Sequence, residues 1–197
     1  MLNEKPHASA APAPQKKKQS LISAAFDYLE IFVYSAVIII LLFTFFTRLT
    51  SVVGPSMQDT LFENEKLLIT DIGYKPKHGD IIVYHELGYY NEPIVKRVIA
   101  TEGQVVDIDF STWTLTVDGE VIEEDYRKVD NGYLVTSDHN FPVTVPENCI
   151  FVLGDNRNHS SDSRDSKMGQ NGFIDTRQIL GKVIIRLFPF DRFGPVR

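Results

Sequence analysis

A serine and a lysine are the residues of this chain whose positions favour covalent chemistry. Ser56 follows a Gly54-Pro55 turn a few residues beyond a long apolar run, and Lys96 lies within the apolar stretch Ile94–Val98. A serine hydroxyl is a weak nucleophile until a neighbouring base removes its proton. Burial can lower the pKa of a lysine by about 3–5 units from about 10.4, which makes it a base near neutral pH. The pair therefore suggests nucleophilic catalysis by Ser56 with Lys96 as the general base.

Both residues also have simpler explanations. In a strand, Lys96 shares one face with Ile94 and Val98, and a lysine in such a place often protects a sheet edge from pairing. A lone serine after Gly-Pro is usually only a turn residue. A histidine base stays open as well, because His78 and His85 are present, although the chain lacks a Gly-x-Ser-x-Gly elbow. Strand patterning alone favours the sheet-edge explanation for Lys96.

Four short stretches follow one another along the chain. They read GPSMQDTL from Gly54, GDIIV from Gly79, VKRV from Val95 and GDNRNHSSDSR from Gly154. In this order, behind an apolar anchor, they resemble the conserved boxes of type I signal peptidases, in the single-anchor form of Gram-positive bacteria. The last stretch is the most specific, and the resemblance covers roughly residues 20–190. It implies a Ser-Lys protease that removes signal peptides from exported preproteins after an Ala-x-Ala pattern.

The resemblance also implies roles for individual residues. Ser56 matches the acylated nucleophile, Lys96 its general base, and Ser160 the serine whose hydroxyl orients the lysine amine. Met57 and Leu61 are expected to line small pockets that admit only small substrate residues. The residues expected to support the site structurally, without a chemical role, are Arg97, Asp155, Asn156, Asp162 and Arg164.

Three positions depart from the family pattern. Gly54 stands where many members carry a hydroxyl residue that donates to the oxyanion, so the oxyanion hole is expected to use the Ser56 N–H and a second backbone group. Removing one such donor typically costs about 10²–10³ in rate. Asp59 replaces a usual proline, and Asn158-His159 replaces the more usual Asp-Asn. Neither of these two changes removes the Ser-Lys pair.

An apolar segment near the N-terminus predicts a membrane anchor over residues 21–48. Within it, Ile31 to Thr47 carries no charged side chain and spans about 26 Å as a helix, against a bilayer core of about 30 Å. A buried soluble helix would be apolar on one face, whereas apolar residues here surround the helix. Residues 1–20 predict a disordered basic tail. Because its lysines precede the anchor, we expect a cytoplasmic N-terminus and an extracytoplasmic protease domain over residues 49–197, in a single-pass protein of the cell membrane.

After the anchor, short apolar runs alternate with turn residues. This pattern predicts a mainly β fold, an antiparallel, barrel-like catalytic domain on a single N-terminal transmembrane helix. The expected strands are 66–70, 81–84, 94–100, 105–110, 115–117, 121–122, 149–153 and 182–188, with one short helical turn near 175–180. Asp118-Gly119 predicts the turn of a hairpin. Residues 105–146 are expected to form a small inserted β region.

Composition limits the partners. The net charge is −6 although the tail is basic, so the folded part is acidic and nucleic acid is not an expected partner. The five histidines are scattered without ligand spacing, and we expect neither a metal nor a cofactor. Cys149 lies in the apolar run CIFVL and is expected to be a buried thiol. The expected partners are the lipid bilayer and preproteins that carry signal peptides.

Other function classes stay open. A self-cleaving Ser-Lys regulator of the repressor type would be soluble and carry a DNA-binding region, which the anchor and the acidic body disfavour. A catalytically inactive, anchored accessory protein that binds secreted or pilus substrates would be indicated by loss of Ser56 or Lys96, and both are present. An active protease that serves only a pilus pathway is also compatible with the sequence.

Overall fold

One long apolar helix and a β-rich unit make up the structure, a computed structural model that describes residues 21–88, 90–130 and 137–196. The helix, α1 (Leu21–Phe46), contains the stretch Ile22–Leu41, whose mean hydropathy of 1.9 and length suit a membrane span. The contacts divide the chain after Leu41, and the unit Leu42–Arg197 contains every described strand.

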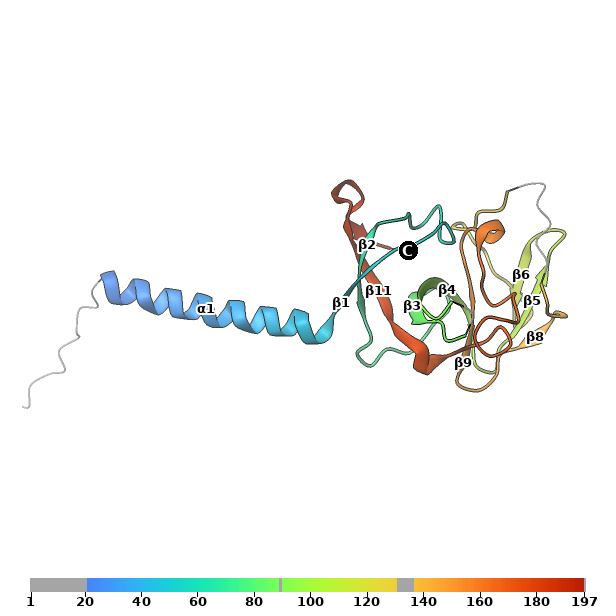
Figure 1. The fold of residues 1–197 in the computed structure, drawn as a ribbon, viewed down its shortest axis with the longest axis horizontal. Coiled ribbons are helices and arrows are strands. Elements are labelled where there is room, and N and C mark those ends of the chain that lie inside the picture. Colours follow the sequence, from blue (N-terminus) through green and yellow to red (C-terminus); the bar gives the residue numbers. More distant parts are fainter. Residues whose placement is uncertain (1–20, 89, 131–136, 197) are drawn as a thin grey trace, which may run out of the picture. The chain divides into compact units, whose positions relative to one another are not determined.

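The larger sheet has eight strands, several of which are labelled in Figure 1. Its strand order is β1-β2-β11-β3-β4-β9-β10, with β12 paired to β11, and all of these pairings are antiparallel. The bounds are β1 (Arg48–Ser51), β2 (Lys66–Thr70), β3 (Ile81–His85), β4 (Pro93–Thr101), β9 (Cys149–Leu153), β10 (Ile174–Asp175), β11 (Ile179–Phe188) and β12 (Gly194–Pro195). This order places β4, which carries the lysine, beside β9, which leads into the polar stretch.

The smaller sheet is formed by residues between β4 and β9. Its order is β7-β6-β5-β8, with β5 (Val105–Asp109), β6 (Thr114–Val117), β7 (Glu120–Val121) and β8 (Val143–Thr144). The β6–β7 hairpin turns at Asp118 and Gly119, whose φ angles of 54° and 82° are both positive, as a type I′ turn requires. The hairpin predicted from Asp-Gly is therefore confirmed.

Three buried apolar clusters form the core of the β unit. One joins the two sheets and includes Ile99, Phe151 and Leu115. A second lies beneath the loop that carries Ser56, and a third includes Val98, Val152 and Ile174. Because these clusters lie on both faces of the larger sheet, its central strands read as continuous apolar runs rather than as alternating ones.

The expected fold class is confirmed, since antiparallel sheets follow one apolar N-terminal helix. The bounds of β2 and β9 match those predicted, and the 3₁₀ turn Thr176–Gln178 occupies the predicted helical turn. The sequence missed four strands: β1, β8, β10 and β12. Three of them have only two residues, and β1 is polar (RLTS), so none shows a strand pattern.

Candidate active site

Ser56 lies in a loop that is anchored in the core. Gly54 has a φ of 79°, which glycine adopts without strain. On the other side of the serine, the side chains of Met57 and Leu61 are 1% and 0% exposed and pack in the apolar cluster beneath the loop. These contacts fix the loop after the serine, while Gly54 gives the chain before it the sharp turn that brings Ser56 over the sheet.

Met57 and Leu61, which the resemblance implies as pocket residues, are buried beneath the serine loop. Their role in the substrate pocket stays a prediction. The Leu61 N–H donates to the Met57 carbonyl over 2.8 Å, so the two residues are one helical turn apart and their side chains share a side. That side faces the core. The cavity beside Ser56 has a volume of about 240 Å³ and is lined by residues that include Val53, Gly54, Tyr90, Ile94 and His159.

Lys96 reaches Ser56 from the middle of β4. It pairs with Ile82 of β3 (register Ile82↔Lys96) and is 2% exposed, so the neighbouring strand and the loop together exclude water from its amine. The Nζ atom donates to Ser56 Oγ over 2.8 Å and to the Val95 carbonyl over 3.2 Å. The structure therefore brings the predicted nucleophile and the predicted base into direct contact.

Burial sets the ionisation of this lysine. Removal from water lowers the pKa of Lys96 to about 8; the charge of Arg164 also lowers it, whereas the carboxylates of Asp162 and Asp155 raise it. Burial dominates because an ammonium loses more hydration than the nearby carboxylates return. A lysine with this pKa is partly neutral near pH 8 and can accept a proton from the hydroxyl it touches.

Arg97, the neighbour of Lys96, forms a buried ion pair. Its Nε and Nη2 donate to the two oxygens of Asp155 over 2.8 and 2.7 Å, and its Nη1 donates to the Gly79 carbonyl over 3.0 Å. The hydroxyl of Thr60 donates to Asp155 over 2.5 Å. Arg97 therefore has its own acidic partner, and two separate ion pairs flank the lysine.

The second ion pair joins Asp162 and Arg164. Arg164 Nε and Nη2 donate to the Asp162 carboxylate over 2.7 and 2.8 Å, and the Gly154 N–H donates to it over 2.9 Å. Burial opposes ionisation of Asp162, but the charge of Arg164 and these hydrogen bonds outweigh it and keep its pKa below the usual value. Asp162 is therefore a buried anion near Lys96.

Ser160 contacts this carboxylate rather than the lysine. Its hydroxyl donates to Asp162 Oδ2 over 2.7 Å, whereas the hydrogen bonds of Lys96 Nζ among the described residues go to Ser56 and Val95. The expected contact between Ser160 and the lysine amine is therefore not formed here. Ser160 thus binds the carboxylate whose charge raises the pKa of Lys96.

Asn156 joins the polar stretch to the serine loop. Its backbone N–H donates to the Ser56 carbonyl over 3.0 Å and its Nδ2 to the Pro55 carbonyl over 3.2 Å. Gly154 packs closely against the serine loop and Ser160. A Cβ at this position would stand 2.2 Å from Ser160 Oγ and 2.5 Å from the Ser56 carbonyl oxygen. The sequence analysis gave Gly154 no role, although a glycine opening the polar stretch was the available signal.

The chain is similar in sequence to known proteins. Residues 25–188 match the family described as "Signal peptidase, peptidase S26". The chain belongs to this family. A probable signal peptidase I-1 of Synechocystis sp. is 34% identical and the match covers 81% of each chain. Signal peptidase I of Bacillus amyloliquefaciens is 32% identical over 90% of this chain and 95% of its own. A crystal structure of a signal peptidase I from Enterococcus faecalis V583 matches at 30% identity, covering 55% of this chain and 97% of that one with a TM-score of 0.45.

Membership of the signal peptidase family confirms the resemblance and, with it, the class of enzyme, a serine endopeptidase. The hydrogen bond to Ser56 Oγ comes from a lysine and not from a histidine among the described residues. The ring of His78 bonds the Ile99 carbonyl over 2.7 Å, and Lys96 is the hydrogen-bond partner of Ser56 Oγ among the described residues. Within the same residues, no group of three His, Cys, Asp or Glu side chains could hold a metal ion.

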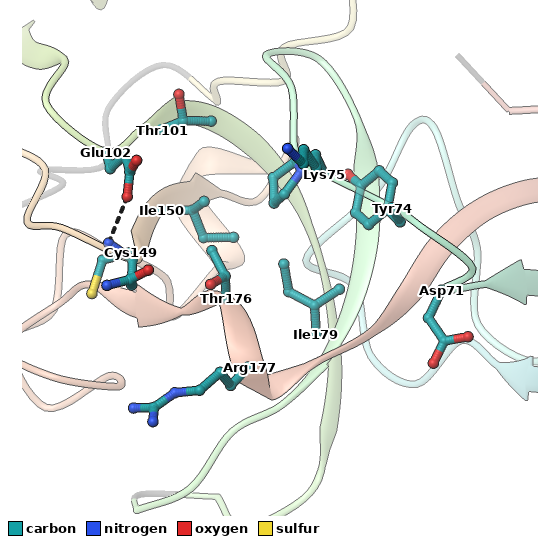
Figure 2. Close-up of a pocket in the computed structure, with 12 residues that line it drawn as sticks. Asp71, Tyr74, Lys75, Thr101, Glu102, Cys149, Ile150, Thr176, Arg177 and Ile179 are labelled. Carbon is teal, nitrogen blue, oxygen red and sulfur yellow. Dashed lines mark hydrogen bonds between the residues drawn. The ribbon is translucent and has the colours of Figure 1, made fainter.

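A larger cavity of this chain lies away from Ser56. Its volume is about 670 Å³, and neither Ser56 nor Lys96 lines it (Figure 2). One wall contains Cys149, which is 5% exposed and whose thiol pKa is raised by burial, as expected for an unreactive thiol. The carboxylate of Glu102 accepts a hydrogen bond from the Asn148 N–H over 2.7 Å across this wall (Figure 2). Nothing in this cavity pairs a nucleophile with a base.

Proposed function

We propose that this chain is a membrane-anchored serine endopeptidase that removes signal peptides from exported preproteins with Ser56 as nucleophile and Lys96 as general base. One observation carries the proposal: Lys96 Nζ lies 2.8 Å from Ser56 Oγ. This distance is within the reach required for proton transfer. The burial that lowers the lysine pKa to about 8 supplies the neutral amine that such a base needs.

The chemistry has two halves. Ser56 Oγ attacks the carbonyl carbon of the scissile bond while Lys96 Nζ accepts the hydroxyl proton, which gives a tetrahedral intermediate and an ammonium. The ammonium returns the proton to the leaving amine, and the mature protein departs from the acyl-enzyme. Lys96 then takes a proton from a water molecule that attacks the ester and returns it to Ser56 Oγ as the ester bond breaks, so the signal peptide leaves with a free carboxylate and the serine hydroxyl is restored.

The negative charge that develops on the carbonyl oxygen needs donors. Among the described residues the Ser56 N–H donates no hydrogen bond, so it supports the role of oxyanion donor. Gly54 provides no hydroxyl for this purpose. A single donor of this kind is worth about 10²–10³ in rate, so a second donor from the backbone of the loop or of the substrate complex is required.

The cavity beside Ser56 supports a preference for small residues before the cut. Its volume of about 240 Å³ is below the usual range for drug-sized ligand pockets, and Val53 and Ile94 narrow it. A small side chain such as alanine fits such a space, whereas a larger one would have to displace the residues that line it. We therefore propose cleavage after an Ala-x-Ala pattern.

The N-terminal helix supports membrane attachment. Ser56 is the tenth residue after Phe46, the last residue of α1, and ten residues can span at most about 36 Å when fully extended. The nucleophile is thus tethered within reach of the membrane face on which α1 ends. The lysines before α1 favour a cytoplasmic N-terminus and an extracytoplasmic Ser56.

The deciding experiment uses the full chain in detergent with a preprotein that carries an Ala-x-Ala site. Wild type is expected to cut after the second alanine, and Ser56→Ala and Lys96→Ala are expected to lose almost all activity while melting as folded proteins. Cleavage that persists in Lys96→Ala would move the base elsewhere. Wild type that binds the preprotein without cutting it would instead support an anchored binding protein.

A further inference from the structure

A segment between the smaller sheet and the active site makes contacts that the proposed mechanism has not used. Residues 122–130, which we call the covering segment, run beside the polar stretch after β9. The Lys128 N–H donates to the Asp155 carbonyl over 2.8 Å, and the Arg157 N–H donates to the Lys128 carbonyl over 2.9 Å. Further along, the Asp130 N–H donates to Asn158 Oδ1 over 2.6 Å. The covering segment is therefore hydrogen-bonded to the turn that supports the site.

A buried ion pair strengthens this attachment. Glu124 of the covering segment and Arg157 of the polar stretch each have a side chain only 1% exposed. Arg157 Nη1 donates to Glu124 Oε2 over 3.0 Å, and Nη2 donates to the other oxygen of the same carboxylate. Such a two-point contact fixes the orientation of the guanidinium as well as its position.

Arg157 also contacts the turn that supports the site, so the ion pair fixes the position of that turn. Its Nε donates to the Gly154 carbonyl over 3.1 Å, and its own carbonyl accepts from Arg164 Nη2 over 2.9 Å. Gly154 in turn lies against the Ser56 carbonyl and Ser160, with no room for a Cβ. A movement of Arg157 would therefore move the turn that touches the serine loop.

The covering segment also shields the other ion pair of the site. The guanidinium carbon of Arg97 lies 3.8 Å from the centre of the Tyr126 ring, a cation–π contact. Arg97 is adjacent to Lys96 and holds Asp155. The same segment thus contacts the support of both the nucleophile and the base.

From these contacts we propose that Glu124 and Arg157 are positioning residues of the Ser56–Lys96 pair. Their ion pair holds the Gly154–Asn156 turn, and Asn156 holds the serine loop by its bonds to the Pro55 and Ser56 carbonyls. Neither residue lines the cavity beside Ser56, so neither is expected to touch the substrate. The inference rests on the proposed function, because it concerns the alignment of the attacking atom and its base.

The test compares Glu124→Gln with Glu123→Gln in full-length protein, assayed on the Ala-x-Ala preprotein beside wild type and Ser56→Ala. Glu123 is the exposed neighbour, so its variant is the matched control. Misplacing a reacting atom by about 1 Å can cost about 10²-fold in rate. We expect Glu124→Gln to lower kcat by about 10- to 100-fold with KM within about twofold, and Glu123→Gln to match wild type.

A second variant separates positioning from stability. Replacing both partners of a buried ion pair by apolar residues often leaves stability unchanged or raises it. Glu124→Met/Arg157→Met is therefore expected to melt close to wild type and still to lose kcat, because nothing then binds the Gly154 carbonyl. The pH profile gives a further readout: if the turn loosens and water reaches Lys96, its pKa rises and the acid limb of kcat/KM moves to higher pH.

The outcomes are distinct. If wild type does not cut, both the proposed function and this inference are overturned. If wild type cuts and the double methionine variant keeps its kcat and its acid limb, Glu124 and Arg157 serve stability alone and the inference is overturned. A loss of kcat in a double variant that melts like wild type supports positioning.

Discussion

Arg97 and Asp155 meet through two hydrogen bonds of 2.8 and 2.7 Å, and their side chains are 2% and 1% exposed. The pair lies next to Lys96, beneath the ring of Tyr126. Its partners approach from β4 and from the turn after β9, which are distant in sequence. The ion pair therefore links the strand that carries the base to the stretch that holds the nucleophile loop.

Removal of one partner should destabilise the protein strongly. Asp155→Asn leaves the Arg97 guanidinium buried without a counter-charge, which typically costs about 3–5 kcal/mol. The matched control is Arg177→Gln, which breaks an ion pair with Asp175 whose arginine is 84% exposed and should cost much less, because water screens the pair. Chemical denaturation of both variants checks this, and equal losses would contradict it.

Activity should depend on pH through Lys96. With a pKa of about 8, the amine is mostly protonated and inactive as a base below that pH, so kcat/KM should rise with pH and level off above about 8. Below pH 7 the rate should fall about tenfold per unit. Initial rates from pH 5.5 to 10, with recovery of activity at pH 8 as a control for damage, give the profile. An acid limb near pH 6.5 would instead indicate a histidine base.

The stability of the folded protein should also depend on pH through Lys96, because its buried ammonium is unfavourable. The pKa of Lys96 is about 8 when folded and 10.5 as a model group, so the unfolded chain binds more protons between these values and stability rises with pH in that window. Below pH 8 the buried charge costs on the order of 3 kcal/mol. Lys96→Met should therefore melt above wild type at pH 7, and the difference should shrink toward pH 10. A constant difference would show that burial does not set this pKa.

Gly154 should tolerate no side chain. In Gly154→Ala the new Cβ would stand 2.2 Å from Ser160 Oγ and 2.5 Å from the Ser56 carbonyl oxygen, so the serine loop must move and kcat should fall by at least about 10²-fold. Gly73→Ala is the control, because Gly73 has a φ of 59° but nothing within 4 Å of its Cβ. It should cost about 1–2 kcal/mol of stability and leave kcat unchanged. Cleavage assays with melting curves compare the two.

Some of this structure follows from local pattern. The bounds of β2 and β9 and the Asp118-Gly119 turn match their predictions because apolar runs and positive-φ residues act within a few residues. The contact between Ser56 and Lys96 is different. The residue pattern around Ser56 or around Lys96 does not predict that the two meet. The prediction of this contact comes from the family resemblance, which considers all four conserved stretches at once.

Two features had no usable signal. Met57 and Leu61 are assigned to the pocket by resemblance, and their sequence alone does not show that both side chains also pack in the apolar cluster beneath the serine loop. Glu124 and Arg157 look like solvated surface charges in the sequence, because a buried ion pair between distant segments depends on tertiary packing alone. The same limit applies to the choice of Asp155 as the partner of Arg97.

The strand β1 is the first part of the β unit after α1, and it is an edge of the larger sheet, paired with β2 from Arg48↔Ile69 to Ser51↔Lys66. The ladder continues at Val52, which exchanges backbone hydrogen bonds with Glu65 and Asn64. A mechanical load entering the chain at Arg48 is therefore borne by these bonds before it reaches Ser56. The ladder therefore limits how far a movement of α1 is transmitted to the alignment of the Ser56 hydroxyl with the Lys96 amine.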